Sequence, residues 1–323
     1  MLAKIVDDKW IYIEQITVAE ESRIDKAFSV TLPNARYIDT SLGYFDGTYH
    51  KYNKFHKRLA RPFLNELKRI CQKHGLPLSV VDHRPPVCKI DSSLVTNDML
   101  DGCVLEDYQV NGIKATCNEE VGTVSCVTGA GKTEMMAGTI KVYGCPTVVL
   151  CDMTTVVDQI CDRLLLRKVA DEIGMFYAGK RPNGQLVVIG SVQSLILPAK
   201  PEKQKSDTPE AYATKLKAFD TRRKNAYKLR KIVGKCDLLI VDECDNATSR
   251  QWKNLFKYWF NGRYRFGYTG TPYDADRPVK NMVLKEHLGS VIFEAKRQEV
   301  LNANRIIPVA YTAIAFGDEA LIK

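Results

Sequence analysis

The chain has 323 residues, of which 45% are hydrophobic and 26% are charged, and its formal net charge is +9. This length allows about two domains with a core each, and the ordinary balance of apolar and charged residues excludes a chain that is disordered throughout. No apolar stretch is long enough for a bilayer and no apolar signal core opens the sequence, so we expect no membrane partner and a cytoplasmic location.

The basic residues and the cysteines narrow the class further. Much of the positive charge lies between Lys200 and Lys235, which fits a polyanionic partner, with nucleic acid as the first candidate. The ten cysteines form no CxxC pair and no Cys/His cluster at zinc spacing. Cys126, Cys151 and Cys236 stand inside apolar runs, which predicts buried, reduced thiols.

The first 86 residues predict a small mixed α+β domain. The sequence Asp82-His-Arg-Pro-Pro86 breaks the pattern that precedes it and marks the boundary. The predicted elements, in chain order, are a strand (9–18), a helix (20–28), a hairpin at Asp46-Gly47, a helix (58–75) and a strand (76–82).

From about Leu94 onward, apolar strands alternate with helical stretches. Nearly continuous apolar strands separated by helices predict an α/β domain over 87–308, in which helices cover both faces of a parallel sheet. The strand ends then share one edge, where ligands bind in such sheets. The predicted strands are 122–127, 147–152, 185–192, 237–243 and 264–270, and the predicted helices are 133–144, 154–174, 209–233 and 249–260.

A glycine-rich loop joins the first of these strands to its helix, in the sequence SCVTGAGKTEMM from Ser125 to Met136. Glycines at this position let the backbone N–H groups turn inward toward a phosphate, and the start of the helix adds its positive dipole end. A lysine there reaches the β- and γ-phosphates, and the hydroxyl that follows binds Mg²⁺. The strict pattern begins with glycine, whereas this chain has Cys126. The predicted ATP-binding residues are Thr128, Gly129, Ala130, Gly131, Lys132 and Thr133.

A second motif supplies two adjacent acids at the end of an apolar strand, in the sequence DLLIVDECDNA. Adjacent acids repel each other and gain nothing structurally without a cation. We expect Asp242 to hold Mg²⁺ through water and Glu243 to orient and deprotonate the attacking water. The pair should lie about one sheet position from the glycine-rich loop, which predicts ATP hydrolysis.

These motifs together resemble those of superfamily 2 helicases. TGAGKT, VDECD and YTGTP follow the order of motifs I, II and III, and LEDYQ (105–109) resembles the Q motif. SVQSL (191–195) resembles the nucleic-acid contact motif between I and II, and residues 1–86 resemble the accessory domain of phage UvsW-type helicases. The resemblance implies a RecA-like fold, an ATP- and Mg²⁺-dependent motor, a single-stranded or branched DNA partner and, for a viral protein, the host cytoplasm.

The resemblance also implies roles for single residues. It implies catalytic roles for Lys132, Asp242 and Glu243, adenine recognition by Gln109, DNA contact by Thr154, Ser191 and Gln193, and coupling by Thr269 and Thr271. The sequence departs from the family at Glu106, where arginine is common, and at Gly270, where alanine is usual. Where the family has a Pro-Thr pair, this chain reads CDMTTVVDQ, so Met153 or Thr154 occupies the threonine position.

The sequence after YTGTP resembles the end of a first motor domain. Residues 309–323 resemble the lead-in to a second motor domain, whose arginine fingers do not follow within the 323 residues. The resemblance thus implies a missing second motor domain, acting in cis, and weak activity of this fragment without it.

Two basic regions leave alternatives open. The stretch 209–233 reads either as a solvated helix face or as a DNA-binding element. Aromatic and basic residues interleave between Arg36 and Arg61, which suits either DNA stacking or a small core with a basic rim.

Three functions therefore follow from the sequence. The first is an ATP-dependent DNA helicase or translocase that acts on branched or duplex DNA. The alternatives are the motor subunit of a restriction-type enzyme, and a nucleic-acid clamp or annealing module with a vestigial nucleotide site. The sequence does not predict the oligomeric state.

Overall fold

The computed structural model describes residues 1–32, 35, 47–87, 89–206 and 208–303. Asp46 of the predicted hairpin turn, the basic and aromatic residues from Arg36 to Tyr44, and the predicted lead-in 309–323 lie outside the described residues. Among the described helices, none combines the length and the hydropathy that crossing a membrane requires.

The N-terminal domain is built on a four-stranded sheet in the order β5-β2-β1-β6. Its apolar core lies between this sheet and two helices, and it includes Ile11, Phe28, Leu59 and Leu67. The strands are β1 (Leu2–Ile5), β2 (Trp10–Glu14), β5 (Arg58–Ala60) and β6 (Ser79–Asp82), the helices are α1 (Val18–Ala27) and α2 (Leu64–Lys73), and β3 (Ser29–Thr31) pairs with β4 (Thr48–His50) in a separate ribbon.

Two predicted boundaries in this domain were wrong. The predicted strand 9–18 ends at Glu14, because Thr17 caps α1 through Glu20. The predicted helix 58–75 begins only at Leu64, since Arg58–Ala60 pair with β2 and Pro62 lies in a 3₁₀ turn, η2 (Arg61–Phe63). Both errors arise where one apolar pattern runs across a change of element.

The second domain contains a seven-stranded sheet in the order β13-β7-β12-β11-β8-β10-β9, and every pair in it is parallel. This confirms the predicted fold class, a RecA-like parallel sheet preceded by a small mixed domain. The strands are β7 (Val121–Ser125), β8 (Thr147–Cys151), β9 (Ile173–Phe176), β10 (Val187–Ser191), β11 (Leu238–Asp242), β12 (Tyr264–Thr269) and β13 (Val291–Glu294).

Helices cover both faces of this sheet, as alternation along β8 shows. Val149 and Cys151 pack into one apolar cluster, whereas Val148 and Leu150 pack into another on the opposite face. The described helices of this domain are α3 (Asp107–Cys117), α4 (Lys132–Tyr143), α5 (Thr154–Leu166), α6 (Pro209–Val233), α7 (Arg250–Asn254), α8 (Pro278–Leu288) and α9 (Arg297–Asn302).

The edges of the sheet were not predicted. The predicted helix 154–174 ends at Leu166, because Lys168 adopts a positive φ of 48°, and the chain then forms β9 at one edge. At the other edge β13 extends the sheet beside β7. The predicted helix 249–260 is also interrupted, since α7 passes into a π-helical turn, η6 (Leu255–Trp259).

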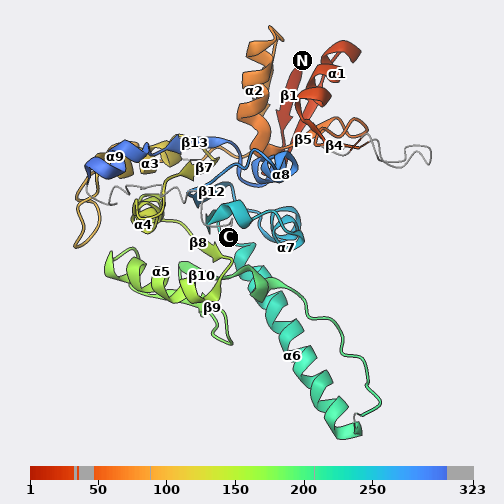
Figure 1. Cartoon of the computed structure of the whole chain (residues 1–323), viewed down its shortest axis with the longest axis vertical. Coiled ribbons are helices and arrows are strands. Elements are labelled where there is room, and N and C mark those ends of the chain that lie inside the picture. The colour runs from red at the N-terminus through yellow and green to blue at the C-terminus, as the bar shows by residue number, and fades with distance from the viewer. Residues whose placement is uncertain (33–34, 36–46, 88, 207, 304–323) are drawn as a thin grey trace, which may run out of the picture.

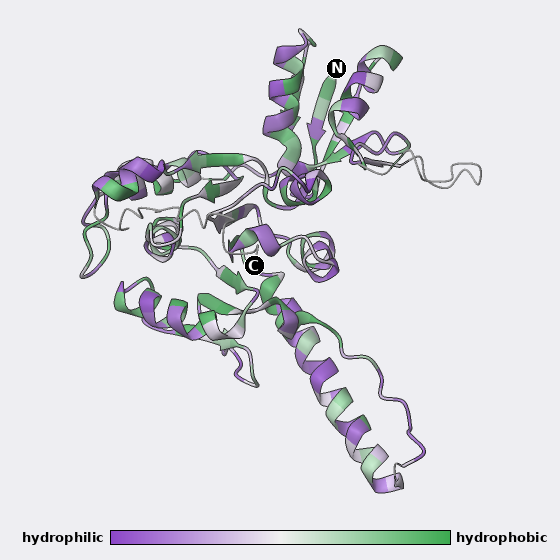
Figure 2. Ribbon diagram, in the orientation of Figure 1, coloured by the Kyte–Doolittle hydropathy of each residue, from purple (hydrophilic) through white to green (hydrophobic). Residues whose placement is uncertain are grey.

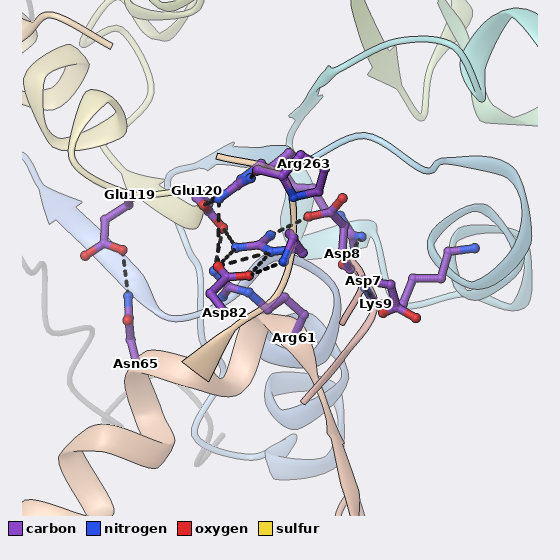
Figure 3. Close-up of polar contacts among 12 residues, drawn as sticks. Asp7, Asp8, Lys9, Arg61, Asn65, Asp82, Glu119, Glu120 and Arg263 are labelled. Atoms are coloured by element: carbon purple, nitrogen blue, oxygen red, sulfur yellow. Dashed lines mark hydrogen bonds and ion pairs between the residues drawn. The ribbon is translucent and has the colours of Figure 1, made fainter. Parts of the chain in front are cut away.

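An ionic cluster around Glu120 joins the two domains (Figure 3). Glu120 precedes β7, and its carboxylate accepts Arg61 at 2.5 Å, Arg84 at 2.8 Å and Arg263 at 2.6 Å. Burial alone would raise the pKa of Glu120, but the three guanidinium groups lower it below its usual value. The cluster therefore fixes the start of the strand that leads into the glycine-rich loop.

Candidate nucleotide-binding and nucleic-acid site

The glycine-rich loop connects β7 to α4 at the carboxyl edge of the sheet. Gly129 and Gly131 have φ angles of 86° and 80°, which residues with a Cβ rarely adopt. A Cβ atom added to Gly131 would lie 2.2 Å from Nε2 of Gln109, so the close packing beneath the loop also requires glycine. Because α4 begins at Lys132, its free N–H groups face the concave side of the loop.

Two side chains of α3 hold this loop from beneath. The hydroxyl of Tyr108 and Nε2 of Gln109 donate to the carbonyl of Ala130, at 2.8 and 2.9 Å. Gln109 is only 1% exposed, and its Oε1 accepts the backbone N–H of Glu106 at 2.9 Å. In this conformation Gln109 binds the loop and is not open to a base, so the predicted adenine contact requires this amide to change partners.

The acid pair faces the loop across one intervening strand. The order β7-β12-β11 places β12 between them, which corrects the expectation of neighbouring positions. Ser125 pairs with Thr269, and Tyr268 pairs with Asp242, so the three strands end at the same edge. Nζ of Lys132 consequently lies 2.5 Å from Oε1 of Glu243.

The two acids differ in environment. Asp242 is 8% exposed, and burial followed by the charge of Glu243 raises its pKa to about 6, although Lys132 opposes this shift. Glu243 has a φ of 45° and a side chain that is 49% exposed. Cys126, which replaces the usual glycine, is buried, and burial raises its pKa to about 12, so its thiol stays protonated.

The residues present fit a magnesium nucleotide. Mg²⁺ in phosphate-transfer sites is held by one or two carboxylates, substrate phosphates and water, with no need for a cage of protein ligands. Accordingly, the described residues contain no group of three or more His, Cys, Asp or Glu placed to hold a metal. Thr133 at the start of α4 and Asp242 at the end of β11 would hold the ion.

Thr269 connects the acid motif to the loop. Its hydroxyl donates to Oδ1 of Asp245 at 3.0 Å and accepts the backbone N–H of Thr271 at 3.2 Å. Its carbonyl accepts the N–H of Cys126 at 2.9 Å. The predicted coupling residues Thr269 and Thr271 therefore lie in one hydrogen-bonded group with both motifs.

The predicted nucleic-acid residues occupy the same edge but differ in access. Thr154 is exposed at the start of α5, and Gln193 is exposed after β10. Ser191 is fully buried, and its hydroxyl accepts the N–H of Gln193 at 3.2 Å. We correct the assignment of Ser191, which caps a turn and does not face solvent. Nε2 of Gln193 donates to Asp152 at 2.9 Å.

A family comparison accounts for this arrangement of motifs. The family model described as type III restriction enzyme, res subunit (ResIII) matches residues 102–274, which include the loop, the acid pair and Thr269. The chain belongs to the ResIII family. A search of curated protein sequences found no match. The predicted superfamily 2 resemblance is thereby confirmed.

Solved structures with the same fold extend beyond the ResIII region. A crystal structure of the UvsW helicase from bacteriophage T4 aligns with a TM-score of 0.66 at 14% identity, covering 91% of this chain and 100% of that one. A second T4 UvsW structure aligns with a TM-score of 0.65 at 14% identity, and the alignment covers 91% of this chain but 57% of that one. These alignments show a common fold that includes the N-terminal domain.

The sequence did not predict three residues that hold the loop, Thr269 and Gln193 in place. Tyr108 holds the loop, Asp245 binds Thr269, and Asp152 orients Gln193. Asp245 is the last acid of VDECD, and Asp152 follows an apolar strand, so position at a strand end was the available signal. Tyr108 offered no such signal because its contact depends on how α3 packs beneath the loop.

Proposed function

We propose that this chain is part of an ATP-dependent DNA helicase or translocase that acts on branched or duplex DNA. Its share of the work is ATP binding and DNA contact. The observation that carries the proposal is the 2.5 Å contact between Lys132 and Glu243, beside a buried acid and at the opening of a glycine-rich loop. An ammonium and two carboxylates gathered there match the charges of a magnesium triphosphate.

The chain's own groups suggest how hydrolysis proceeds. The N–H groups of the loop and of the first turn of α4 bind phosphate oxygens, and Lys132 exchanges Glu243 for the β- and γ-phosphates. Glu243, once released, orients a water molecule and accepts its proton. A nearby cation would stabilise the charged form of Asp242, because burial and Glu243 have raised its pKa to about 6. Thr133 and Asp242 would hold magnesium, which would supply positive charge for the phosphates.

DNA contact falls to the same edge of the sheet and to the N-terminal domain. Thr154 and Gln193 present a hydroxyl and an amide to solvent, the kind of group that binds backbone phosphates without reading bases. We assign residues 1–86 an accessory role in DNA binding and residues 87–308 the motor. Thr269 and Thr271 would transmit the state of the nucleotide to this edge through Asp245.

The test is ATP hydrolysis with and without DNA, together with binding of a fluorescent ATP analogue, in the intact wild-type protein and in its Lys132→Ala variant. We expect the variant to lose nucleotide binding and all DNA-stimulated hydrolysis. Lys141→Ala is the matched control, since Lys141 lies on the same helix and pairs with Asp101, at 3.5 Å. A wild-type hydrolysis rate that ignores DNA, or a Lys132→Ala variant that hydrolyses ATP normally, would overturn the motor.

The ResIII match supports a second candidate, the motor subunit of a restriction-type enzyme. Both candidates hydrolyse ATP, so they differ in the fate of the DNA. A restriction motor leads to cut strands, whereas a helicase or branch-remodelling motor releases intact strands. Gel analysis of a labelled branched substrate after incubation of the intact protein with Mg-ATP separates the two outcomes.

A further inference from the structure

Helix α6 extends from the motor domain with little contact along most of its length (Figure 1). It has 25 residues, which corresponds to about 37 Å at the usual rise per residue. Only Ala226, Leu229 and Val233, near its C-terminal end, are buried. In Figure 2, helix α6 carries many hydrophilic (purple) residues, whereas the strands of the sheet are mostly hydrophobic (green). Burial in the core therefore does not account for a helix of this length.

Local contacts nevertheless hold α6 as a single rod. Thr208 caps its first turn by accepting the N–H of Ala211, and the hydroxyl of Tyr212 donates to the carbonyl of Pro201 at 3.3 Å. At the base, Nε of Arg230 donates to the carbonyl of Leu195 at 2.8 Å, and its guanidinium lies 3.9 Å above the ring of Trp259. The helix is thus fixed to the motor domain at one end.

Four lysines form one face of this rod, which we call the lysine face. Lys217, Lys224, Lys228 and Lys231 follow one another at intervals of 7, 4 and 3 residues, which places them on the same side of a helix. All four are exposed, and they point away from the side that buries Ala226, Leu229 and Val233.

The lysine face is not neutralised by the chain. In the part of the chain that the structure describes, none of the four lysines forms an ion pair, and Asp220 in the same helix does not pair with them. Four like charges over about 21 Å of helix repel one another and gain from an anion that follows the helix. A row of phosphates meets that requirement.

We propose that the lysine face binds the sugar-phosphate backbone of duplex DNA, as a second contact outside the motor site. Proteins that bind single strands combine positive charge with aromatic side chains on which bases stack. Tyr212 and Phe219 are half-buried, and the single exposed aromatic residue beside the lysine face is Tyr227, whose ring centre lies 5.7 Å from the guanidinium of Arg230. A rigid row of four ammonium groups with one flanking ring fits the regularly spaced phosphates of paired DNA better than a single strand, which needs successive stacking surfaces.

This inference deepens the proposed function and rests on it for the partner. Ala226 and Leu229 of α6 line a pocket together with Gln193, whereas the lysine face lies on the opposite side of this helix. Two contacts on different sides of the motor suit DNA with more than one arm. The helix would hold one arm while the motor engages another.

The experiment measures binding of a labelled 30-base-pair duplex and of the corresponding single strand to the 323-residue chain by fluorescence anisotropy without nucleotide, between 50 and 200 mM salt. The variant changes Lys217, Lys224, Lys228 and Lys231 to glutamine, which keeps side-chain length and helix propensity. We expect duplex affinity to fall about 10- to 100-fold at low salt, and the slope of log K against log salt to fall by about 3 to 4, since each phosphate contact contributes about 0.9. Affinity for the single strand should change less than threefold.

Two further variants isolate the cause. Replacing the same four lysines by arginine keeps the charge and should preserve duplex binding, which also shows that substitutions on this face leave the fold intact. Glutamine at Lys89, Lys141, Lys253 and Lys257, four exposed lysines elsewhere in the motor domain, lowers the net charge equally and should change affinity less than threefold. Unchanged duplex binding by the first variant, equal loss in this control, or equal loss on single strands would overturn the proposal.

The test of the motor proposal is independent of the test of the lysine face. Lys132→Ala should bind duplex like the wild type in this assay, because the lysine face lies on a different element from the nucleotide loop. Loss of DNA-stimulated hydrolysis in Lys132→Ala with normal duplex binding supports both proposals. Loss of duplex binding in Lys132→Ala would show that the loop, and not the helix, governs this contact, and would overturn the role of the lysine face.

Discussion

The molecule contains two clusters of oppositely charged side chains, and they differ in the ratio of positive to negative charge. Around Glu120, one carboxylate meets Arg61, Arg84 and Arg263, and those arginines lower its pKa. At the nucleotide loop, Lys132 alone faces two carboxylates, and the pKa of Asp242 is raised to about 6 by burial and by Glu243. One site has enough positive charge for its acids and the other has too little.

The difference separates a structural contact from a binding site. The Glu120 carboxylate already has three guanidinium partners, so this cluster serves to hold the domains together. The acid pair gains from any cation that reaches it, because a buried carboxylate beside another carboxylate is destabilised in its charged form. A magnesium ion and a triphosphate would supply the charges that this site lacks, as the proposed function requires.

The largest expected effect comes from Glu243→Gln, which removes a negative charge from the acid pair at the glycine-rich loop. We expect ATP hydrolysis to fall by about 10²- to 10⁴-fold, the usual contribution of a positioned general base, while nucleotide binding is retained because Lys132 no longer has a competing partner. Steady-state hydrolysis and analogue binding measure the two effects. Glu294→Gln, an exposed acid at the end of β13, is the control, and normal hydrolysis by Glu243→Gln would refute the assigned role.

The next test, Glu120→Ala, removes the carboxylate that the three arginines share. Removing this carboxylate leaves buried guanidinium groups without their shared partner, and we expect the free energy of unfolding to fall by about 3–5 kcal/mol. Denaturant unfolding measures this loss. Glu119→Ala is the matched control, since the neighbouring Glu119 accepts one hydrogen bond from Asn65 at 2.8 Å and should cost about 1 kcal/mol. Equal losses in the two variants would contradict the difference between them.

A third test uses pH at the contact between α8 and the acid motif. His287 is buried with Nδ1 2.8 Å from the carbonyl of Ala247, and burial lowers its pKa to about 4. The unfolded chain therefore binds a proton near pH 6.5, which the folded chain binds only near pH 4. The contribution of His287 to the free energy of unfolding should be complete above pH 7 and should fall by about 2 kcal/mol between pH 7 and pH 5, whereas Asp242, whose pKa is raised, acts in the opposite direction.

Unfolding of the wild type and of His287→Gln across this range checks the prediction. The variant lacks the titrating imidazole, so its stability should depend less steeply on pH than that of the wild type. Parallel curves for the two proteins would show that another group causes the loss at low pH.

The smallest expected effect comes from Thr269→Val, which removes the hydroxyl between the acid motif and the glycine-rich loop. Losing the 3.0 Å hydrogen bond to Asp245 should lower the free energy of unfolding by about 1 kcal/mol. The ratio of ATP hydrolysis with DNA to hydrolysis without DNA should fall as well. Thr214→Val, whose hydroxyl donates to the carbonyl of Glu210 in the same helix, serves as control. An unchanged ratio would remove Thr269 from the coupling path.

The sequence by itself determined the parallel sheet and the residues of the nucleotide loop and acid pair. Continuous apolar runs predict buried strands, and the glycines beside Lys132 predict a phosphate loop, because both signals depend on residues adjacent in the chain. The strand order confirms the parallel sheet, and the ResIII match covers the residues of both motifs.

Only the tertiary structure decided which of these side chains are accessible and what they contact. It turned Gln109 toward Ala130, buried Ser191, and placed β9 and β13 at the edges of the sheet. It also brought Arg61 and Arg263 to Glu120 across 59 and 143 residues of sequence. No local pattern encodes such contacts, because they arise from how distant elements pack together, and packing also decides whether a charge is compensated or left for a ligand.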